Sequence, residues 1–464
     1  MNTICAPATA PGGAIGIIRI SGEDAIRIAN TIFSKNILTA SGYTMHYGAI
    51  IQPSVKEASK EDTPTGPTTI DDVIVSICRS PHSYTGEDTV EISHHGSSYI
   101  QKRILHLLME NGCQMAKPGE FTQRAFLNGK MDLSQAEAVA DLIASNNEAS
   151  HRVAFNQMRG AITHKLADLR SRLLTITSLL ELELDFSEED VEFADRKQLT
   201  TLSQETLNEI DRLRQSFSSG NAIKNGIPVA IIGAPNVGKS TLLNLLLQDD
   251  KAIVSDIQGT TRDIIEDTIT LGGYLFRFID TAGIRDTNDT IERLGIERSL
   301  KAASKAQIII LLTEPGVPYP AIETTPGQYI IYVQNKSDKE ENHRPLISTL
   351  NLPVTNISIS ALLDRGIETL QQSLIDHARI ICGNDNSDQV LITNLRHKEA
   401  LDLASADMLR AIDSIQMGIS GDLIAEDLRL CLSHLSEILG SQITTDEVLG
   451  NIFKNFCIGK VNTD

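Results

Sequence analysis

Residues 233–240 read GAPNVGKS, a segment that fits the pattern G-x-x-x-x-G-K-S/T of loops that hold nucleotide phosphates. An apolar run typical of a strand, residues 228–232, comes before it, and residues 241–247 continue as an apolar helix. Gly233 and Gly238 let the backbone curl so that several N–H groups point at anionic oxygens. The stretch therefore predicts a strand, a phosphate-binding loop and a helix in succession.

Two side chains at the end of this loop add specific chemistry. Lys239 places a cation where the outer phosphates of a nucleotide would lie, and Ser240 offers a hydroxyl to Mg²⁺. The start of the following helix adds the positive end of its dipole. We therefore expect a nucleoside triphosphate to bind together with Mg²⁺.

Three further segments follow strand-like runs in the order expected for a guanine-nucleotide switch. The segment DTAG at 280–283 offers a carboxylate that can hold Mg²⁺ through water and a glycine N–H for the γ-phosphate. In NKSD at 335–338, Asp338 can accept two hydrogen bonds from N1–H and the exocyclic amine of guanine, which adenine does not offer. The segment SAL at 360–362 suits backbone recognition of the guanine oxygen. Together they predict GTP rather than ATP.

The catalytic water has no obvious partner in this sequence. Thr261 is the expected switch threonine, which coordinates Mg²⁺ only while the γ-phosphate is present. Many signalling GTPases carry a glutamine after DTAG to orient the water, but Ile284 stands there and cannot do so. The candidates left open are Arg285, Glu292 and a cation held near Asn236.

Changes of pattern along the chain predict three structural parts. Residues 226–380 alternate apolar strands with helices, which implies a mostly parallel sheet covered on both faces. Helical periodicity before and after this part predicts one helical domain interrupted by an inserted domain. The inserted strands are expected at 228–232, 267–271, 275–279, 307–312, 329–333 and 354–358, and the late helices at 395–417, 421–439 and 445–455.

The resulting fold prediction is a multidomain α/β plus all-α chain. It combines an N-terminal α+β domain, a discontinuous helical domain and an inserted Ras-like P-loop G domain. The boundaries are expected at 1–122 for the N-terminal domain, 123–222 and 383–464 for the helical domain, and 223–382 for the G domain.

Composition limits the range of functions. The formal net charge of −19 gives no global attraction to nucleic acid, so any RNA contact needs a local patch or a partner protein. The six cysteines form no C-x-x-C pair, which favours a reducing, cytoplasmic setting over structural zinc. No apolar run approaches the ~18 residues of a membrane span, and the first residues do not have the pattern of a secretory signal.

Four long segments, together with GTTRD, DTAGIR and NKSD, resemble the MnmE (TrmE) family of tRNA modification GTPases over essentially the full length. These segments are ATAPGGAIGIIRISG at 8–22, SPHSYTGEDTVEISHHG at 80–96, PGEFTQRAFLNGKMDLSQAEAVADLI at 118–143 and FCIGK at 456–460.

The resemblance implies a potassium-activated GTPase that acts as a homodimer. With the FAD-dependent partner MnmG (GidA), in a heterotetramer, it would add a carboxymethylaminomethyl or aminomethyl group at carbon 5 of the wobble uridine of certain tRNAs. A 5-formyl- or 5,10-methylene-tetrahydrofolate would supply the one-carbon unit. The N-terminal domain would then bind the folate and dimerise.

Site residues follow from the motifs and from the resemblance. The expected catalytic residues are Glu292, which matches the family's water-orienting glutamate, Arg285, and the C-terminal cysteine Cys457. The expected GTP contacts are Asn236, Val237, Gly238, Lys239, Ser240, Thr241, Ser255, Asp256, Ile257, Gln258, Gly259, Thr260, Thr261, Asp280, Thr281, Ala282, Gly283, Asn335, Lys336, Asp338, Ser360 and Ala361. The implied Mg²⁺ ligands are Ser240 and Thr261, and the implied K⁺ ligands are Asn236, Ser255, Ile257 and Thr260. The implied folate-binding residues are Arg19, Glu91, Lys130 and Lys460.

Two other functional classes stay open at this point. The G-domain motifs alone would equally fit a ribosome-assembly or signalling GTPase, from which the first 130 residues and FCIGK distinguish the chain. The chain would alternatively be a folate-binding aminomethyl-transfer protein whose G domain is of minor importance.

Overall fold

The computed structural model describes most of the chain as helices and strands joined by short loops. The described residues are 2–52, 68–185, 196–248, 267–279, 301–320, 322–339, 355–383 and 390–440. Those within Met1–Ile143, Gln157–Ala167 and Leu435–Asp464 form one compact unit, and those within Ala144–Asn156 and Asp168–His434 form a second.

The first unit is built on a six-stranded sheet of order β3-β4-β5-β2-β1-β6. All its strand pairs are antiparallel except β1 with β6. The strands are β1 Ile4–Pro7, β2 Ile15–Ser21, β3 Thr44–Gln52, β4 Thr68–Cys78, β5 Thr89–His95 and β6 Gln114–Met115. The helices of this part are α1 Ala25–Ile32, α2 Ser98–Glu110, α3 Glu120–Leu127 and α4 Leu133–Ala144.

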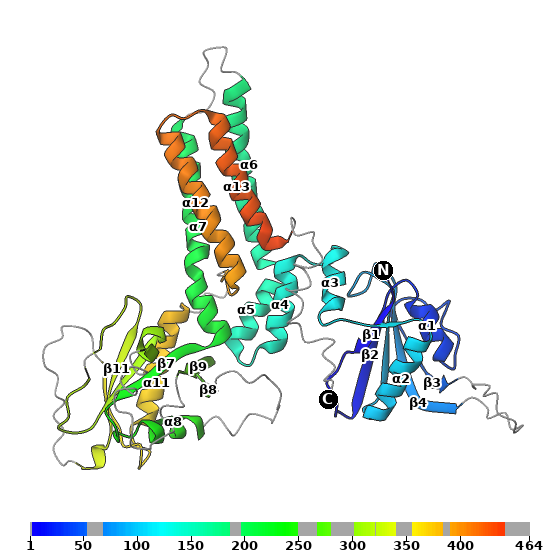
Figure 1. Cartoon of the computed structure of the whole chain (residues 1–464), viewed down its shortest axis with the longest axis horizontal. Helices are drawn as coiled ribbons and strands as arrows, with labels where there is room; N and C mark the ends of the chain where they lie inside the picture. The colour runs from blue at the N-terminus through cyan, green and yellow to red at the C-terminus, as the bar shows by residue number, and fades with distance from the viewer. Residues whose placement is uncertain are drawn as a thin grey trace, which may run out of the picture. The chain divides into compact units, whose positions relative to one another are not determined.

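Alternation of side chains gives this sheet two different faces. Ile18 and Ile20 of β2 are fully buried in one core together with residues of α1 and α2 (Figure 1). The residue between them, Arg19, points to the opposite face because successive strand residues alternate. That opposite face also carries Glu91, the cross-strand partner of Arg19 on β5. The sheet therefore has an apolar side under two helices and a side that carries polar groups.

The second unit contains a mostly parallel sheet of order β12-β11-β10-β7-β9-β8. Only β8 with β9 is antiparallel. The central strand β10 is buried at all six positions, as expected for a strand covered on both faces. The elements are β7 Ile227–Gly233, α8 Lys239–Gln248, β8 Asp267–Leu271, β9 Tyr274–Phe278, β10 Ile308–Thr313, β11 Tyr329–Gln334, the 3₁₀ turn Ser337–Lys339, β12 Thr355–Ser358 and α11 Ile367–Cys382.

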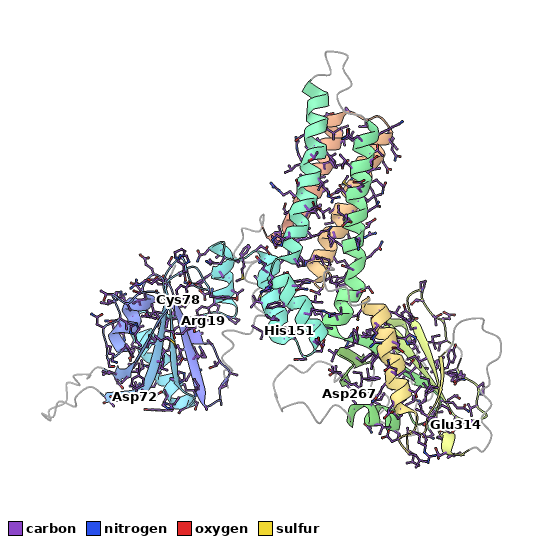
Figure 2. All side chains as sticks on the ribbon, turned by 180° about the vertical axis from the view of Figure 1, so that it is seen from behind. Arg19, Asp72, Cys78, His151, Asp267 and Glu314 are labelled. Atoms are coloured by element: carbon purple, nitrogen blue, oxygen red, sulfur yellow. The ribbon has the colours of Figure 1, made fainter. Side chains whose placement is uncertain are left out.

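Long helices form the rest of the described chain. Figures 1 and 2 show α6, α7, α12 and α13 running side by side. Ser405 on α12 donates to Asp211 on α7 at 2.8 Å, one of the polar links between two helices that are distant in sequence. The helices are α5 Glu148–Met158, α6 Ala161–Asp185, α7 Arg196–Asn225, α12 Leu395–Gln416 and α13 Gly421–Leu439.

The nucleotide domain is joined to the helices at one end of α7. Gly226, in a left-handed conformation with φ of 83°, leads directly from α7 into β7. On the return path, the Ser219 hydroxyl donates to the Ile381 carbonyl at 2.7 Å, and the Ile392 N–H donates to the Ser216 hydroxyl at 3.1 Å. A Cβ on Gly220 would overlap the Ile392 carbonyl oxygen, so only glycine permits this close approach.

The predicted fold class is confirmed. An α+β N-terminal part, helices drawn from both sides of an insertion and an inserted Ras-like α/β domain are all present. All six expected strands match β7 to β12 within a residue or two, and helices 395–417 and 421–439 match α12 and α13. The expected helix at 445–455 lies outside the described residues, and β12 is described from residue 355.

Candidate functional site

The phosphate-binding loop lies between β7 and α8, as predicted. Gly233 ends β7 against the neighbouring strand β10, where a Cβ would overlap the Leu312 carbonyl oxygen. Asn236 and Gly238 have positive φ angles of 62° and 98°, so the loop turns sharply twice before the helix begins. The glycines of the motif are therefore required by close approach and by backbone conformation.

The Lys239 side chain folds back across this loop. Its Nζ donates to the carbonyl oxygens of Gly233 at 2.8 Å and Ala234 at 2.9 Å. Burial lowers the pKa of the ammonium, because the charged form loses hydration. Anionic phosphate oxygens would be stronger partners for this cation than neutral carbonyls. Ser240 and Thr241 follow in the first turn of α8, where N–H groups are free for a phosphate.

Asn335 joins the phosphate loop to the two predicted base-recognition segments. It is 3% exposed. Its Nδ2 donates to the Val237 carbonyl at 2.8 Å, and its Oδ1 accepts from the Ala361 N–H at 3.0 Å. A Cβ on Gly238 would overlap the Asn335 amide, which gives a second reason for glycine there. One buried amide thus fixes three segments that are separated by up to 124 positions in the sequence, from Val237 to Ala361.

The expected guanine acceptor is held in its charged form. Ser360 Oγ donates to Asp338 Oδ1 at 2.6 Å, and this hydrogen bond keeps the pKa of the carboxyl below its usual value. Lys336, with a φ of 62°, forms an ion pair of 2.5 Å with Glu314. Glu314 follows the buried strand β10 and was not foreseen from the sequence, although its position one residue after a central parallel strand was a usable signal.

A second set of predicted residues meets on the polar face of the N-terminal sheet. Arg19 Nε donates to Glu91 Oε1 at 2.7 Å across strands β2 and β5. The guanidinium lies 5.5 Å from the Tyr84 ring centroid and 5.6 Å from that of Phe121, a cation–π arrangement. Figure 2 labels Arg19 on β2 and Cys78 on β4, the strand on the far side of β5. The two aromatic rings were missed, because neither is close to Arg19 in sequence.

Lys130 approaches the same region from another segment. Its Nζ donates to the Pro81 carbonyl at 3.0 Å, in the loop that also carries Tyr84. A Cβ on Gly86 of this loop would lie 3.3 Å from the Lys130 stem, so the two segments are in close contact. Arg19, through Tyr84, and Lys130, through Pro81, therefore border one loop, residues 79–88, and Glu91 is bonded to Arg19.

Several predicted residues lie outside the described part of the chain. They are Ser255 to Thr261, Asp280 to Gly283, Arg285, Glu292, Cys457 and Lys460. Among the described residues, no group of three or more His, Cys, Asp and Glu side chains could hold a metal ion. No helix within the described ranges is long and apolar enough to cross a membrane.

The strand order, the glycine-dependent loop and the Asn335 junction define a nucleotide-binding domain of the P-loop GTPase class. Comparison of the full sequence with known proteins narrows this class to one family. The chain belongs to the family of tRNA modification GTPases called MnmE, which confirms the resemblance noted from its motifs. A family profile described as the MnmE helical domain matches residues 133–457, and one described as the GTP-binding protein TrmE N-terminus matches residues 3–130.

Individual relatives agree with this membership over the whole chain. The tRNA modification GTPase MnmE of Parabacteroides distasonis is 51% identical over 99% of this chain and 100% of that protein. The protein of the same name from Bacteroides thetaiotaomicron is 52% identical, with 99% of each chain covered. Among solved structures, Era of Aquifex aeolicus bound to GDP·AlF4⁻ is 23% identical over 39% of this chain and 66% of that chain, with a TM-score of 0.23.

Proposed function

We propose that the chain binds and hydrolyses GTP, and that this hydrolysis serves the modification of the wobble uridine of certain tRNAs. The single observation that carries the GTP part is the Asn335 junction, which fixes the phosphate loop and the base-recognition segments in one arrangement. Membership of the family of tRNA modification GTPases supports the role in tRNA modification. We also propose the domain limits 1–122, 123–222, 223–382 and 383–464.

Guanine selection would rest on Asp338. Its ionised carboxylate offers two acceptor oxygens to the adjacent N–H donors of guanine. The hydrogen bond from Ser360 occupies part of one oxygen and orients the group. Lys336, paired with Glu314, supports the same loop. Adenine lacks the donor pair, so an ionised carboxylate that is already oriented would discriminate against it.

For the ions, we propose that Ser240 and Thr261 bind Mg²⁺ and that Asn236, Ser255, Ile257 and Thr260 bind K⁺. Oxygen donors of this kind suit both cations. Asn236 lies at the first positive-φ turn of the phosphate loop, which supports a role for its amide beside the expected phosphates. A fixed cation there would neutralise charge that develops in the transition state. Glu292 would orient the water, since Ile284 cannot, and Arg285 is a further candidate for this role.

For the one-carbon chemistry, we propose that Arg19, Glu91, Lys130 and Lys460 bind a tetrahydrofolate derivative, which would supply the one-carbon unit. Within the described residues, Arg19 donates to Glu91 through Nε. The N–H groups of Nη1 and Nη2 can therefore donate to an anionic ligand. The partly exposed ring of Tyr84 adds apolar surface of the sort that a flat heterocycle contacts, and the fully buried ring of Phe121 supports the guanidinium. The donor set therefore fits a ligand with a carboxylate tail and a heteroaromatic ring.

The proposed assembly is a homodimer that works in the cytoplasm with the FAD-dependent MnmG (GidA) and tRNA. The outer edge of the N-terminal sheet supports self-association, because Tyr43, Met45, Tyr47 and Ile74 are 74%, 69%, 63% and 40% exposed there. Tyr47 and Ile74 are cross-strand partners, so their side chains form one patch. Cys457 would act near the folate, with a nucleophilic role left to experiment.

The test is GTP turnover in KCl and in NaCl, measured on the wild type and on Asn236→Ala. Turnover in KCl should greatly exceed turnover in NaCl, and the variant should lose this difference while still binding GDP. Equal wild-type rates in the two salts would refute the cation role.

The second candidate, a folate protein whose G domain is dispensable, is favoured by the separate polar face on the N-terminal sheet. Analysis of wobble bases in tRNA from a Lys239→Ala strain decides between them. Full modification in that strain would show that GTP hydrolysis is not needed, whereas unmodified tRNA supports the first proposal.

A further inference from the structure

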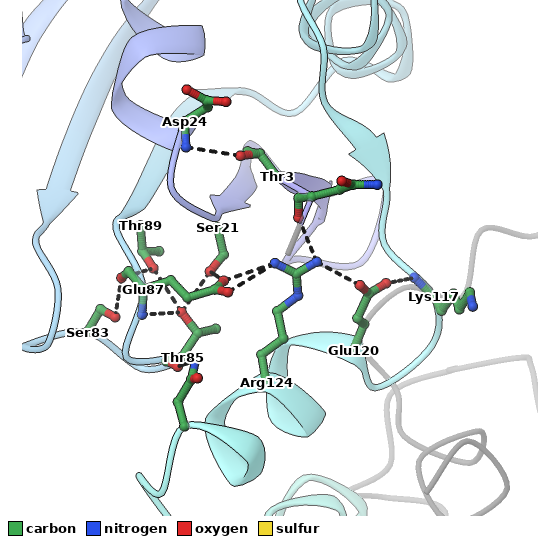
Figure 3. Close-up of polar contacts among 12 residues, drawn as sticks. Thr3, Ser21, Asp24, Ser83, Thr85, Glu87, Thr89, Lys117, Glu120 and Arg124 are labelled. Carbon is green, nitrogen blue, oxygen red and sulfur yellow. Dashed lines mark hydrogen bonds and ion pairs between the residues drawn. The ribbon is translucent and has the colours of Figure 1, made fainter. Parts of the chain in front are cut away.

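A polar network in the N-terminal unit joins α3, the loop before β5 and the end of β2 (Figure 3). Its centre is Arg124 of α3, which is 4% exposed. Arg124 Nη1 donates to both carboxylate oxygens of Glu87, at 3.0 and 3.3 Å. Its Nη2 donates to the Asn2 carbonyl at 2.8 Å and to Glu120 Oε1 at 2.9 Å. A single guanidinium therefore connects α3 to the loop before β5 and to the start of the chain.

The network continues from Glu87 into strand β2. The Ser21 hydroxyl donates to Glu87 Oε2 at 2.8 Å and lies 2.7 Å from the Thr85 hydroxyl. Asn128, just after α3, donates to the Thr85 carbonyl at 2.7 Å. We call these five residues, Ser21, Thr85, Glu87, Arg124 and Asn128, the clamp. It joins the end of β2, the loop 79–88, the interior of α3 and the residue that follows α3.

Three of the five clamp residues lie close in sequence to a residue that borders the proposed ligand site. Ser21 lies two positions after Arg19 on β2, and Asn128 lies two positions before Lys130. Thr85 is adjacent to Tyr84, whose hydroxyl lies 2.9 Å from that of Thr122 on α3. Among the described residues, no hydrogen bond or ion pair joins the clamp to Arg19, Glu91 or Lys130. The clamp instead fixes relative to one another the three segments that carry Arg19, Tyr84 and Lys130.

We propose that the clamp is a positioning device for the folate-class ligand, with the Arg124–Glu87 ion pair as its decisive contact. This inference rests on the proposed folate function. Because binding requires several groups on different segments to converge on one ligand, a small displacement of a segment weakens all of their contacts together. The planar guanidinium of Arg124 holds Glu87 through Nη1, and it holds Asn2 and Glu120 through Nη2. Together these contacts fix both distance and direction, which a single hydrogen bond does not.

The experiment measures binding of 5-formyltetrahydrofolate to the full-length protein by calorimetry. Glu87→Gln keeps the shape of the side chain but removes its charge, and it should weaken binding at least tenfold. Asn128→Ala removes one hydrogen bond made by an exposed residue, and it should weaken binding severalfold with little change in Tm. GDP affinity of both variants should equal that of the wild type, which shows that the chain is otherwise intact.

The matched control separates positioning from stability. Ile28→Ala truncates a buried side chain of α1 on the other face of the same sheet, without contact to the clamp. It should lower Tm by as much as Glu87→Gln while leaving folate affinity within twofold. If Ile28→Ala weakens binding as much as Glu87→Gln at equal loss of Tm, or if both clamp variants bind normally, the positioning role is wrong. Failure of the wild type to bind the probe would instead overturn the folate function itself, and the clamp's role with it.

Discussion

The Asn335 junction gives the sharpest prediction about the G domain. Replacing Asn335 with Ala removes the donor to the Val237 carbonyl and the acceptor for the Ala361 N–H. Each buried group left without a partner costs about 1–3 kcal/mol, so the two together cost about 2–6 kcal/mol. In the free protein the loops can relax and take up water, whereas a bound nucleotide requires all three segments in place. The cost therefore falls mainly on the bound state.

A cost of 2 kcal/mol corresponds to a loss of affinity of about 30-fold, and this is the smallest effect expected for GDP. Titration calorimetry on the full-length variant measures it. Tyr319→Phe serves as the control, because it removes one hydrogen bond of 3.1 Å to Asn356 in the same sheet and touches neither loop. The control should bind GDP within twofold of the wild type. If Asn335→Ala also binds within twofold, the junction does not organise the site and the reasoning is refuted.

Three further predictions concern single contacts. Glu314→Gln removes the ion pair with Lys336. Because this pair is partly exposed, GDP affinity should fall by about two- to fivefold at low salt and by less at high salt. A loss of affinity that does not depend on salt would contradict this prediction. Gly220→Ala should lower Tm because the new Cβ overlaps the Ile392 carbonyl. Helix propensity alone predicts the opposite, a higher Tm. The sign of the change in Tm, measured by thermal unfolding, therefore shows which effect is larger. Burial lowers the pKa of Lys239 in the folded state, so the folded protein binds fewer protons than the unfolded one between that lowered pKa and the ordinary 10.5. Wild-type stability relative to Lys239→Met should therefore rise with pH in that window, and a constant difference in Tm between the two proteins would count against it.

The parts of the fold that could be predicted from sequence are those with local signals. The strand β10 is an uninterrupted apolar run, and the loop 233–240 has a fixed spacing of glycines and a lysine, so both were placed correctly. Arg19 and Glu91 were assigned to one ligand site only through the family resemblance, and their direct pairing was not predicted. No local pattern specifies which residue on another strand lies opposite Arg19.

The features that sequence did not predict depend on contacts between distant segments. Arg124 and Glu87 are separated by 37 positions, and each taken alone reads as an ordinary surface charge. Gly220 lies inside a long helix, where glycine would be unfavourable, and its reason is visible only once Ile392 is seen against it. Such contacts arise from tertiary structure, so neither hydrophobic periodicity nor a sequence motif predicts them.

The close approach of Gly220 to Ile392 has a consequence for how such a chain could be rearranged. The points at which the backbone leaves the helices and comes back to them are almost touching. If the inserted nucleotide-binding domain were deleted, a short turn could join the two ends of the helical domain. The helical domain should therefore still fold without the inserted domain. For the same reason, a different domain whose N- and C-termini lie close together could be inserted at this position.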